Sequence, residues 1–103
     1  MDRFMKAAKR YLHLKGAEIL GTEWRFIVFQ DLDDTLVFVY IADEEGYEST
    51  NRADLRHAFE HAAASFFKEN DIEFEGNLRC DLIEFDVISN DHAIVKHTIN
   101  AIN

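Results

Sequence analysis

The chain has 103 residues, and 48 % of them are hydrophobic, so it can form one domain over residues 1–103 with a core of its own. Its formal net charge is −9, and its single cysteine, Cys80, excludes an internal disulfide and favours a reducing, cytoplasmic location. The longest mainly apolar run, residues 36–42, is too short to span a membrane, and the acidic Asp2 with no apolar segment beside it argues against a signal peptide. Disorder and membrane insertion are therefore excluded, and a soluble intracellular domain is predicted.

The first predicted element is an amphipathic helix over residues 3–15. One of its faces is apolar and is formed by Phe4, Ala8, Tyr11 and Leu12. The helix is expected to end at Gly16, a residue typical of helix C-termini. Two short extended runs, 18–24 and 25–29, predict a hairpin, and the acidic residues 31–34 predict a turn. Residues 35–42 are apolar on both faces, which is typical of a central strand covered on both sides.

After a polar loop at residues 43–50, the hydrophobic period becomes that of a helix. Asn51 is a suitable N-cap, with Asp54 in the first turn. The positions expected to face the core are Leu55, Ala58, Phe59, Ala62, Ala63 and Phe66. Residues 78–88 predict a long strand, residues 90–91 a turn, and residues 93–99 a final strand. The order α-β-β-β-α-β-β predicts an α/β (α+β) domain in which a mixed sheet is flanked by two helices.

Charge is unevenly distributed along the chain. Residues 1–25 have a local charge of +3, whereas the other 78 residues have −12. Proteins bind nucleic acid largely by neutralising its phosphates with Lys and Arg, so this acidic body should repel DNA unless the basic stripe of Arg3, Lys6 and Arg10 contacts it alone. Nucleic acid is therefore an unfavourable partner on charge alone, and a solvated surface is the simpler interpretation.

Six short segments, in order along nearly the whole chain, resemble a known family. Residues 7–12 (AAKRYL), 15–20 (KGAEIL) and 23–25 (EWR) are similar to the opening of the YraN family of predicted endonucleases, where A-x-R-Y-L leads to K-G-Y-x-I-L and N-W-R. Residues 35–39 (TLVFV) match its central strand, residues 79–83 (RCDLI) its R-F-D-V-I strand, and residues 97–102 (HTINAI) its H-I-x-N-A-F terminus. The resemblance implies a restriction-endonuclease-like fold related to archaeal Holliday-junction resolvases, and a nucleic-acid substrate.

The activity inferred for that family, phosphodiester hydrolysis, uses a divalent metal ion held by carboxylates, with a lysine nearby. The resemblance places the family's helix glutamate at Met5 and its metal-binding aspartate at Ile27. It places the glutamate and lysine of the family's F-V-E-V-K strand at Tyr40 and Ala42. None of the four side chains is a carboxylate or an amine, so they cannot bind a divalent metal ion or supply a positive charge. We therefore expect a catalytically inactive protein that uses no cofactor. It would act through contacts with another protein or by self-association.

The strand period of two places Tyr40 and Ala42 on one face, and we expect Ile27 and Met5 to approach that face and complete an apolar plug. Either ordinary core packing or a retained binding cleft is compatible with such a plug. An alternative function also stays open, namely a divergent endonuclease with Mg²⁺ or Mn²⁺ as its cofactor. Its carboxylates would come from strand ends and would include Asp31, Asp33, Asp43 and Glu44, which otherwise suit solvated turns.

Two further features could carry chemistry. His57 to His61 reads H-x-x-E-H, the arrangement that inverted zinc peptidases use. The apolar stripe of the predicted helix puts both histidines on the solvated side, with no cleft or third ligand expected there, so incidental metal binding is a better interpretation than zinc catalysis. Cys80 has no Cys-x-x-Cys partner, and we expect it to be a small buried hydrophobic residue rather than a nucleophile.

Overall fold

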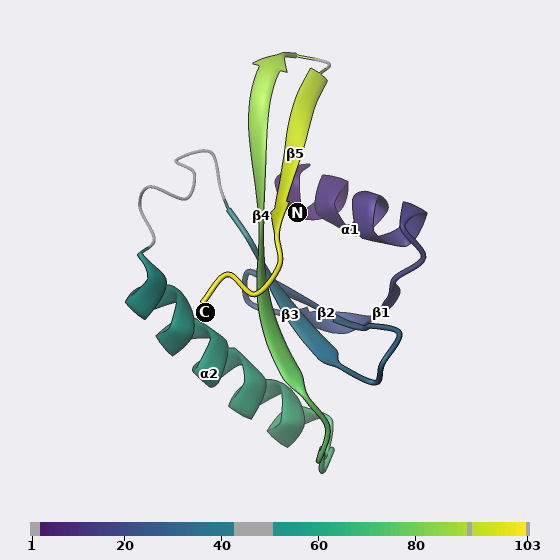
Figure 1. Cartoon of the computed structure of the whole chain (residues 1–103), viewed down its shortest axis with the longest axis vertical. Coiled ribbons are helices and arrows are strands. Elements are labelled where there is room, and N and C mark those ends of the chain that lie inside the picture. Colours follow the sequence, from purple (N-terminus) through teal and green to yellow (C-terminus); the bar gives the residue numbers. More distant parts are fainter. Residues whose placement is uncertain (1–2, 43–50, 91, 103) are drawn as a thin grey trace.

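The computed structural model describes residues 3–42, 51–90 and 92–102. Two helices and five strands follow one another in the order α-β-β-β-α-β-β, as predicted (Figure 1). They are α1 (Arg3–Leu14), β1 (Glu18–Glu23), β2 (Phe26–Gln30), β3 (Leu36–Ile41), α2 (Arg52–Glu69), β4 (Leu78–Ser89) and β5 (His92–Thr98). The predicted α+β arrangement is confirmed, and each strand begins and ends within one residue of its predicted limits. The predicted loop at 43–50 and residue 91 of the predicted turn lie outside the described residues.

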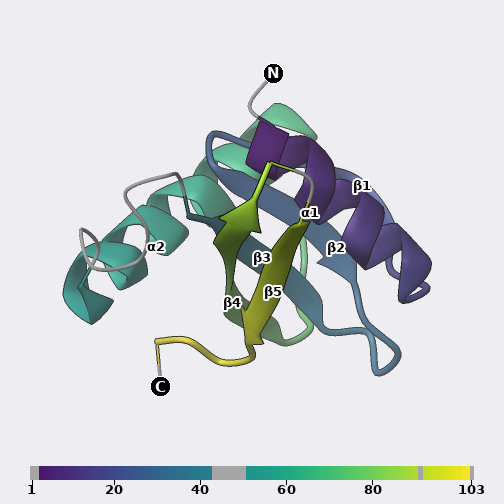
Figure 2. The ribbon, with the colours of Figure 1, turned by 90° about the horizontal axis from the view of Figure 1, so that it is seen from above.

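All five strands belong to one mixed sheet. They lie side by side in chain order, and neighbouring strands are antiparallel except β3 and β4, which are parallel. A parallel pair cannot be joined by a tight turn, and α2 lies in the crossover connection between these two strands. Figure 2 shows α1 on one face of the sheet and α2 on the other. The elements therefore form three layers, with the sheet in the middle.

Strand β3 divides the hydrophobic core into two halves. Val37 and Val39 pack in the half that includes α1, whereas Leu36 and Phe38 pack in the half that includes α2. All four side chains are buried. The continuous apolar sequence of β3 is explained by this position, because a strand covered on both faces has no solvated side for polar residues. The prediction of a central strand covered on both sides is confirmed.

Helix α1 ends at the predicted glycine. Gly16 has a φ of 86°, in the left-handed region, and its N–H donates to the carbonyl of His13. The N–H of Ala17 donates to the carbonyl of Leu12 at 3.0 Å. These two bonds form a Schellman motif, which supplies hydrogen bonds to carbonyls that the end of a helix otherwise leaves without partners.

Replacing Gly16 by alanine is expected to lower the free energy of unfolding by about 1 kcal/mol. A Cβ atom built at Gly16 has nothing within 4 Å, so the cost comes from the left-handed backbone and not from a clash. Asparagine tolerates this conformation better, and Gly16→Asn is the matched control, with a smaller loss expected. Urea unfolding measures the free energy of unfolding of both variants. Equal stability of the alanine variant and the unchanged protein would contradict the prediction.

Helix α2 begins with the predicted cap. The side-chain oxygen of Asn51 accepts a hydrogen bond from the N–H of Asp54 at 2.8 Å. Four of the six expected core positions of the helix are buried, and the other two, Ala58 and Phe59, are partly buried against the same cluster.

In the part of the chain that the structure describes, no helix is long and apolar enough to cross a membrane.

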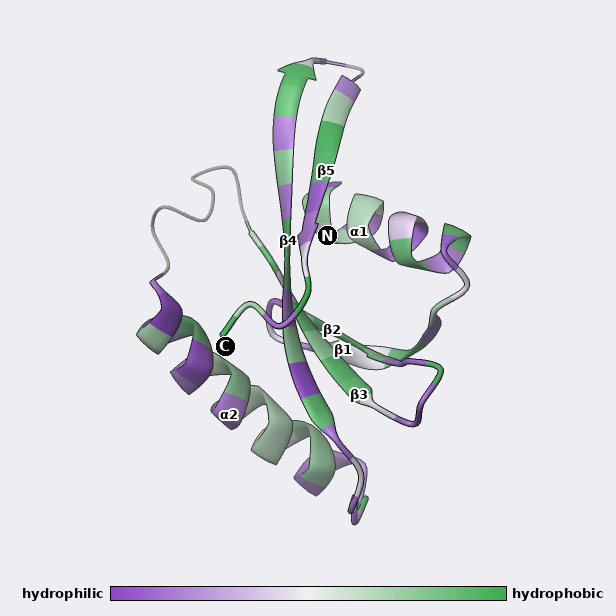
Figure 3. Cartoon of the chain, in the orientation of Figure 1, coloured by the Kyte–Doolittle hydropathy of each residue, from purple (hydrophilic) through white to green (hydrophobic). Residues whose placement is uncertain are grey.

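The β4–β5 hairpin projects from the rest of the molecule. Figure 1 shows that it extends past both helices along the longest axis, which measures 43 Å. Hydrophobic and hydrophilic residues alternate along its distal half (Figure 3). Neither helix covers this distal half completely, and the side chains of Val87, Ile88 and Ile94 are 43 %, 65 % and 55 % exposed. The hairpin thus presents apolar side chains to solvent on an edge of the sheet.

Candidate functional site

The four positions matched to the nuclease residues do not come together. Met5 and Ile27 are buried in the core half on the α1 side of the sheet. Ala42 is buried on the α2 side, and Tyr40 packs against that same half. The predicted four-residue plug is therefore wrong. The reason is register: Ile27 is paired with Val39 across the β2–β3 ladder, and directly paired residues point to the same face of a sheet.

The side chains around Ile27 on the α1 side of the sheet are nevertheless apolar in the observed register. The β3 residues that share a face with Ile27 are Val39 and Ile41, and all three are 0 % exposed. Met5 closes the same cluster from α1 and is 8 % exposed. These side chains offer no oxygen or nitrogen ligand. This part of the fold is filled as ordinary core.

The carboxylates of the β2–β3 turn are engaged in local structure. Asp31 accepts a hydrogen bond on Oδ1 from the N–H of Leu32, and its Oδ2 forms an ion pair with Arg79 at 2.9 Å. Asp33 accepts a hydrogen bond from the N–H of Thr35, and the bonds to Thr35 lower the pKa of its carboxyl. The predicted turn is confirmed. Asp43 and Glu44 lie outside the described residues.

A buried carboxylate forms the centre of the most extensive polar network in the described residues. Asp81 of β4 is 0 % exposed, and it shares a face with the apolar residues around α1. Arg79 donates to both of its oxygens, from Nε at 2.8 Å and from a terminal nitrogen at 3.0 Å. The other terminal nitrogen of Arg79 binds Asp31 at 2.9 Å, and the N–H of Asn100 donates to Asp81 at 3.1 Å.

The network continues through a histidine to α1. His97 of β5 lies 2.9 Å from Asp81 through Nε2, which must donate because an ionised carboxylate only accepts. In the neutral imidazole Nδ1 is then an acceptor, and the hydroxyl of Tyr11 lies 3.1 Å from it. We call these five side chains, Tyr11, Asp31, Arg79, Asp81 and His97, the Asp81 network. It joins α1, the β2–β3 turn, β4 and β5.

The electrostatics of the Asp81 network favour the ionised carboxylate. Burial alone would raise the pKa of Asp81, but the hydrogen bonds from His97, Arg79 and Asn100 outweigh burial and lower it below the ordinary 3.8. The hydrogen bond to Asp81 in turn raises the pKa of Arg79. Among the described residues, no buried side-chain nitrogen or oxygen lacks a hydrogen-bond partner. The charges inside the network therefore compensate one another.

The Asp81 network borders a hollow of about 250 Å³ beside the end of α1, which includes Lys15 and His97 in its lining. Both ring nitrogens of His97 are already engaged, and Arg79 is shared by two carboxylates. A ligand in the hollow would have to break these contacts in order to use them. The geometry thus suits a structural clamp better than a catalytic centre.

The contribution of Asp81 to stability is expected to fall in acid. Because its pKa in the folded protein is lowered from 3.8, this contribution is complete above that value and is lost as the pH decreases toward the lowered pKa. Urea unfolding of the unchanged protein and of Asp81→Asn, followed between about pH 6 and pH 2, measures the effect. The stability difference between the two proteins should shrink in acid. A difference that stays constant over this range would contradict the prediction.

Sequence reasoning missed the Asp81 network, although four of its five residues, all but Asp31, lie in three of the segments that carry the family resemblance. A signal was present in the alternation of β4. Asp81 is two residues before Ile83, which is buried, so the strand period alone puts both on one face. A carboxylate in such a position requires partners, and the Arg two residues earlier was the nearest candidate.

The histidines of α2 are exposed, as predicted, but the expectation that no cleft adjoins them is wrong. Their ring centroids lie 4.5 Å apart. His57 and His61 line a hollow of about 470 Å³ together with Glu23 and Trp24 from the β1–β2 hairpin. The expectation failed because the turn between β1 and β2 reaches over α2, a tertiary contact that the helical period does not encode. Among the described residues, no group of three His, Cys, Asp or Glu side chains is arranged to hold a metal ion.

The single cysteine is buried and the basic stripe on α1 is exposed, as the sequence predicts. Cys80 is 1 % exposed in the core half beside α2, and burial, followed by the charge of Asp81, raises the pKa of its thiol to about 12. A thiol with this pKa is a poor nucleophile at neutral pH. The stripe residues Arg3, Lys6 and Arg10 are exposed on α1.

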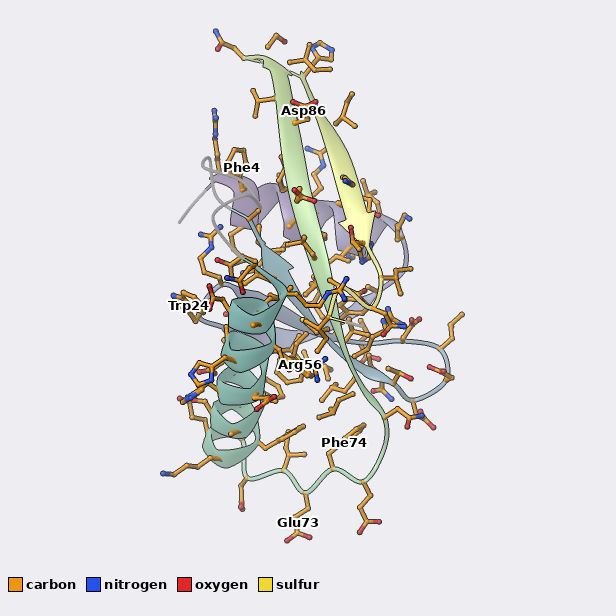
Figure 4. The ribbon with its side chains drawn as sticks, turned by 60° about the vertical axis from the view of Figure 1, so that its left-hand side comes forward. Phe4, Trp24, Arg56, Glu73, Phe74 and Asp86 are labelled. Carbon is orange, nitrogen blue, oxygen red and sulfur yellow. The ribbon has the colours of Figure 1, made fainter. Side chains whose placement is uncertain are left out.

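A groove of about 330 Å³, lined by apolar side chains and also by Arg3, Ser89, Asn90 and His92, separates the start of α1 from the distal part of the β4–β5 hairpin. Phe4 of α1 stacks on Phe85 of β4 at its floor, with ring centroids 5.3 Å apart. Val87, Ala93 and Val95 continue the apolar lining toward the hairpin tip. In Figure 4, the labels of Phe4 and Asp86 locate the start of α1 and the distal part of β4.

Comparison with known protein families, with curated proteins and with solved structures gives no match to the chain. The class that the fold itself defines is an α+β protein with a five-stranded mixed sheet between two helices. Any function must be inferred from the geometry of the chain's own residues.

Proposed function

We propose that the chain is a non-catalytic protein with a restriction-endonuclease-like fold, related to the YraN family, that acts through protein contacts. The observation that carries this proposal is the filling of the matched positions by core side chains. Met5 and Ile27 pack with Val39 and Ile41 on the α1 side of the sheet, whereas Tyr40 and Ala42 belong to the α2 side, so the four positions do not gather the carboxylates and the lysine that metal-dependent hydrolysis needs. The family relationship in this proposal rests on the six segments that resemble YraN proteins in order along the chain.

The contact surface proposed is the distal β4–β5 hairpin with the groove beside α1, and the occupant proposed is a second copy of the chain. Strand β5 is at the edge of the sheet, and an edge strand offers unpaired backbone groups to another strand. The exposed apolar side chains of Val87, Ile88 and Ile94 are concentrated on this hairpin. Two copies, each with a net charge of −9, repel one another at low salt, so association should strengthen as salt is added.

Sedimentation equilibrium at low salt and at about 0.15 M salt tests self-association. A dimer that is stronger at the higher salt concentration is expected, and Val87→Lys, which places a charge in the groove, should weaken it. Leu32→Lys is the matched control, because Leu32 is a fully exposed apolar residue on the β2–β3 turn, away from the hairpin. A chain that stays monomeric in both conditions would overturn the self-association part of the proposal.

The non-catalytic part of the proposal is tested separately with DNA. Purified protein should not cleave branched, single-stranded or duplex DNA in Mg²⁺ or Mn²⁺. Its DNA binding should be weak and should decrease steeply with salt, since the acidic body of the protein repels phosphates and the basic stripe on α1 attracts them. Metal-dependent cleavage that disappears in Asp33→Ala or Glu44→Ala would favour the divergent-endonuclease alternative instead.

A further inference from the structure

The two exposed histidines of α2 are spaced to act on the same ion. Residues four apart lie one above the other on a helix, and the imidazoles of His57 and His61 meet with their ring centroids 4.5 Å apart. Helical histidine pairs with this spacing bind metal in zinc enzymes, so the spacing is compatible with chelation by both rings. Both side chains are solvent-exposed, so an ion can reach them without any opening of the fold.

The surroundings of the pair form a recess rather than a flat helix surface. The β1–β2 hairpin reaches the same side of α2, and Glu23 and Trp24 line the hollow with the two histidines. Figure 4 shows Trp24 beside the upper half of α2. Trp24 is 69 % exposed and is held by contacts with the rings of Phe26 and Tyr40. The carboxylate of Glu23 gives the recess a negative charge that attracts a cation.

The chemistry of these groups selects the class of metal. Imidazole nitrogen suits Zn²⁺, Cu²⁺ and Ni²⁺, whereas Mg²⁺ and Ca²⁺ prefer oxygen ligands. For nitrogen ligands of one geometry, affinity among the divalent first-row ions is greatest for Cu²⁺. Two imidazoles fill two coordination positions, and water can fill the rest because the recess is open to solvent.

We propose that His57 and His61 form an open binding site for a late first-row transition-metal ion, with Cu²⁺ the tightest-binding member of that class. The site lies on the α2 side of the sheet, opposite the apolar side chains that pack between α1 and the sheet. It is therefore independent of the non-catalytic function proposed above. It is also distinct from a Mg²⁺ or Mn²⁺ nuclease site, because its ligands are nitrogens.

Trp24 is the only tryptophan of the chain and lines the same hollow, so its fluorescence reports on this site. Titration of the full chain with a copper(II) salt should quench the fluorescence in a saturable manner, because paramagnetic Cu²⁺ quenches a nearby indole. Addition of a large excess of Zn²⁺, which is diamagnetic and competes for the same nitrogens with lower affinity, should restore it. Mg²⁺ should have no effect at the same concentrations.

His57→Gln and His61→Gln test the ligands, and both variants should fold because the side chains are exposed. Each is expected to raise the Cu²⁺ concentration needed for half-quenching by about tenfold or more, since one of two nitrogen ligands is lost. His13→Gln, which removes an exposed histidine at the end of α1, is the matched control and should leave the titration unchanged. Quenching that is equal in all three variants, or that a large excess of Zn²⁺ does not reverse, would overturn the proposal.

Discussion

Replacing Asp81 by alanine is expected to lower the free energy of unfolding by about 3–5 kcal/mol. The substitution removes the carboxylate that accepts two hydrogen bonds from Arg79 and one from His97. Both partners are largely buried and cannot regain full hydration, so the cost is that of leaving the imidazole of His97 without its acceptor and Arg79 with Asp31 alone. Because the network joins two strands, a turn and a helix, its loss should also reduce the cooperativity of unfolding. Urea unfolding followed by circular dichroism measures both quantities.

The matched control for this substitution lies on the same strand. Asp86 of β4 is exposed, and Asp86→Asn should change the free energy of unfolding by no more than about 0.5 kcal/mol. The loss of unfolding free energy in Asp81→Asn is expected to lie between those of Asp81→Ala and Asp86→Asn, because asparagine keeps the shape and one acceptor oxygen but loses the charge. If Asp81→Ala were as stable as Asp86→Asn, the Asp81 network would not hold these segments together.

The second large effect is expected when nuclease residues are introduced at the matched positions. The triple variant Ile27→Asp, Tyr40→Glu, Ala42→Lys should lose more than about 4 kcal/mol and should fail to fold cooperatively. Ile27 is 0 % exposed and Ala42 is 2 % exposed, so two of the new charges are buried. They also lie in opposite halves of the core, where a carboxylate at position 27 could not pair with an ammonium group at position 42. Thermal unfolding and DNA cleavage are measured on the same preparation.

Single variants test whether burial of the new charge causes the loss of stability. Ile27→Asp alone should account for most of the loss, whereas Ile94→Asp makes the same substitution at a side chain that is 55 % exposed and should cost about 0.5 kcal/mol or less. A triple variant with the same melting temperature as the unchanged protein would show that these positions are not packed core. Metal-dependent cleavage by that variant would show that the site can be restored, which the division between the two core halves argues against.

Most of the fold was predictable because its signals are local. The left-handed Gly16, the cap formed by Asn51 and the apolar run around Phe38 each determine their element through neighbouring residues or through the period of the pattern. The order of the elements then restricted the architecture to a mixed sheet between two helices, and the structure agrees. The same local information predicted that Cys80 would be buried.

The candidate sites were less predictable because they depend on which segments meet. The alternation of each strand correctly placed Tyr40 and Ala42 on a common face, but it could not choose between the two faces of the neighbouring strand. The observed pairing of Ile27 with Val39 decided that question and separated the four matched positions. In the same way, the period of α2 placed His57 and His61 on one side, while only the position of Trp24 showed that they border a recess.

The sequence by itself determined the helices, the strands, their order and the absence of carboxylates and lysine from the four positions matched to nuclease residues. Hydrophobic period, capping and turn residues act over a few positions, so one chain contains that information in readable form. The tertiary structure alone decided the strand register, the convergence of Arg79 and His97 on Asp81, and the recess beside α2. These features arise from side chains that are far apart in sequence, and such long-range pairings are selected by packing and by the satisfaction of buried polar groups in the complete fold.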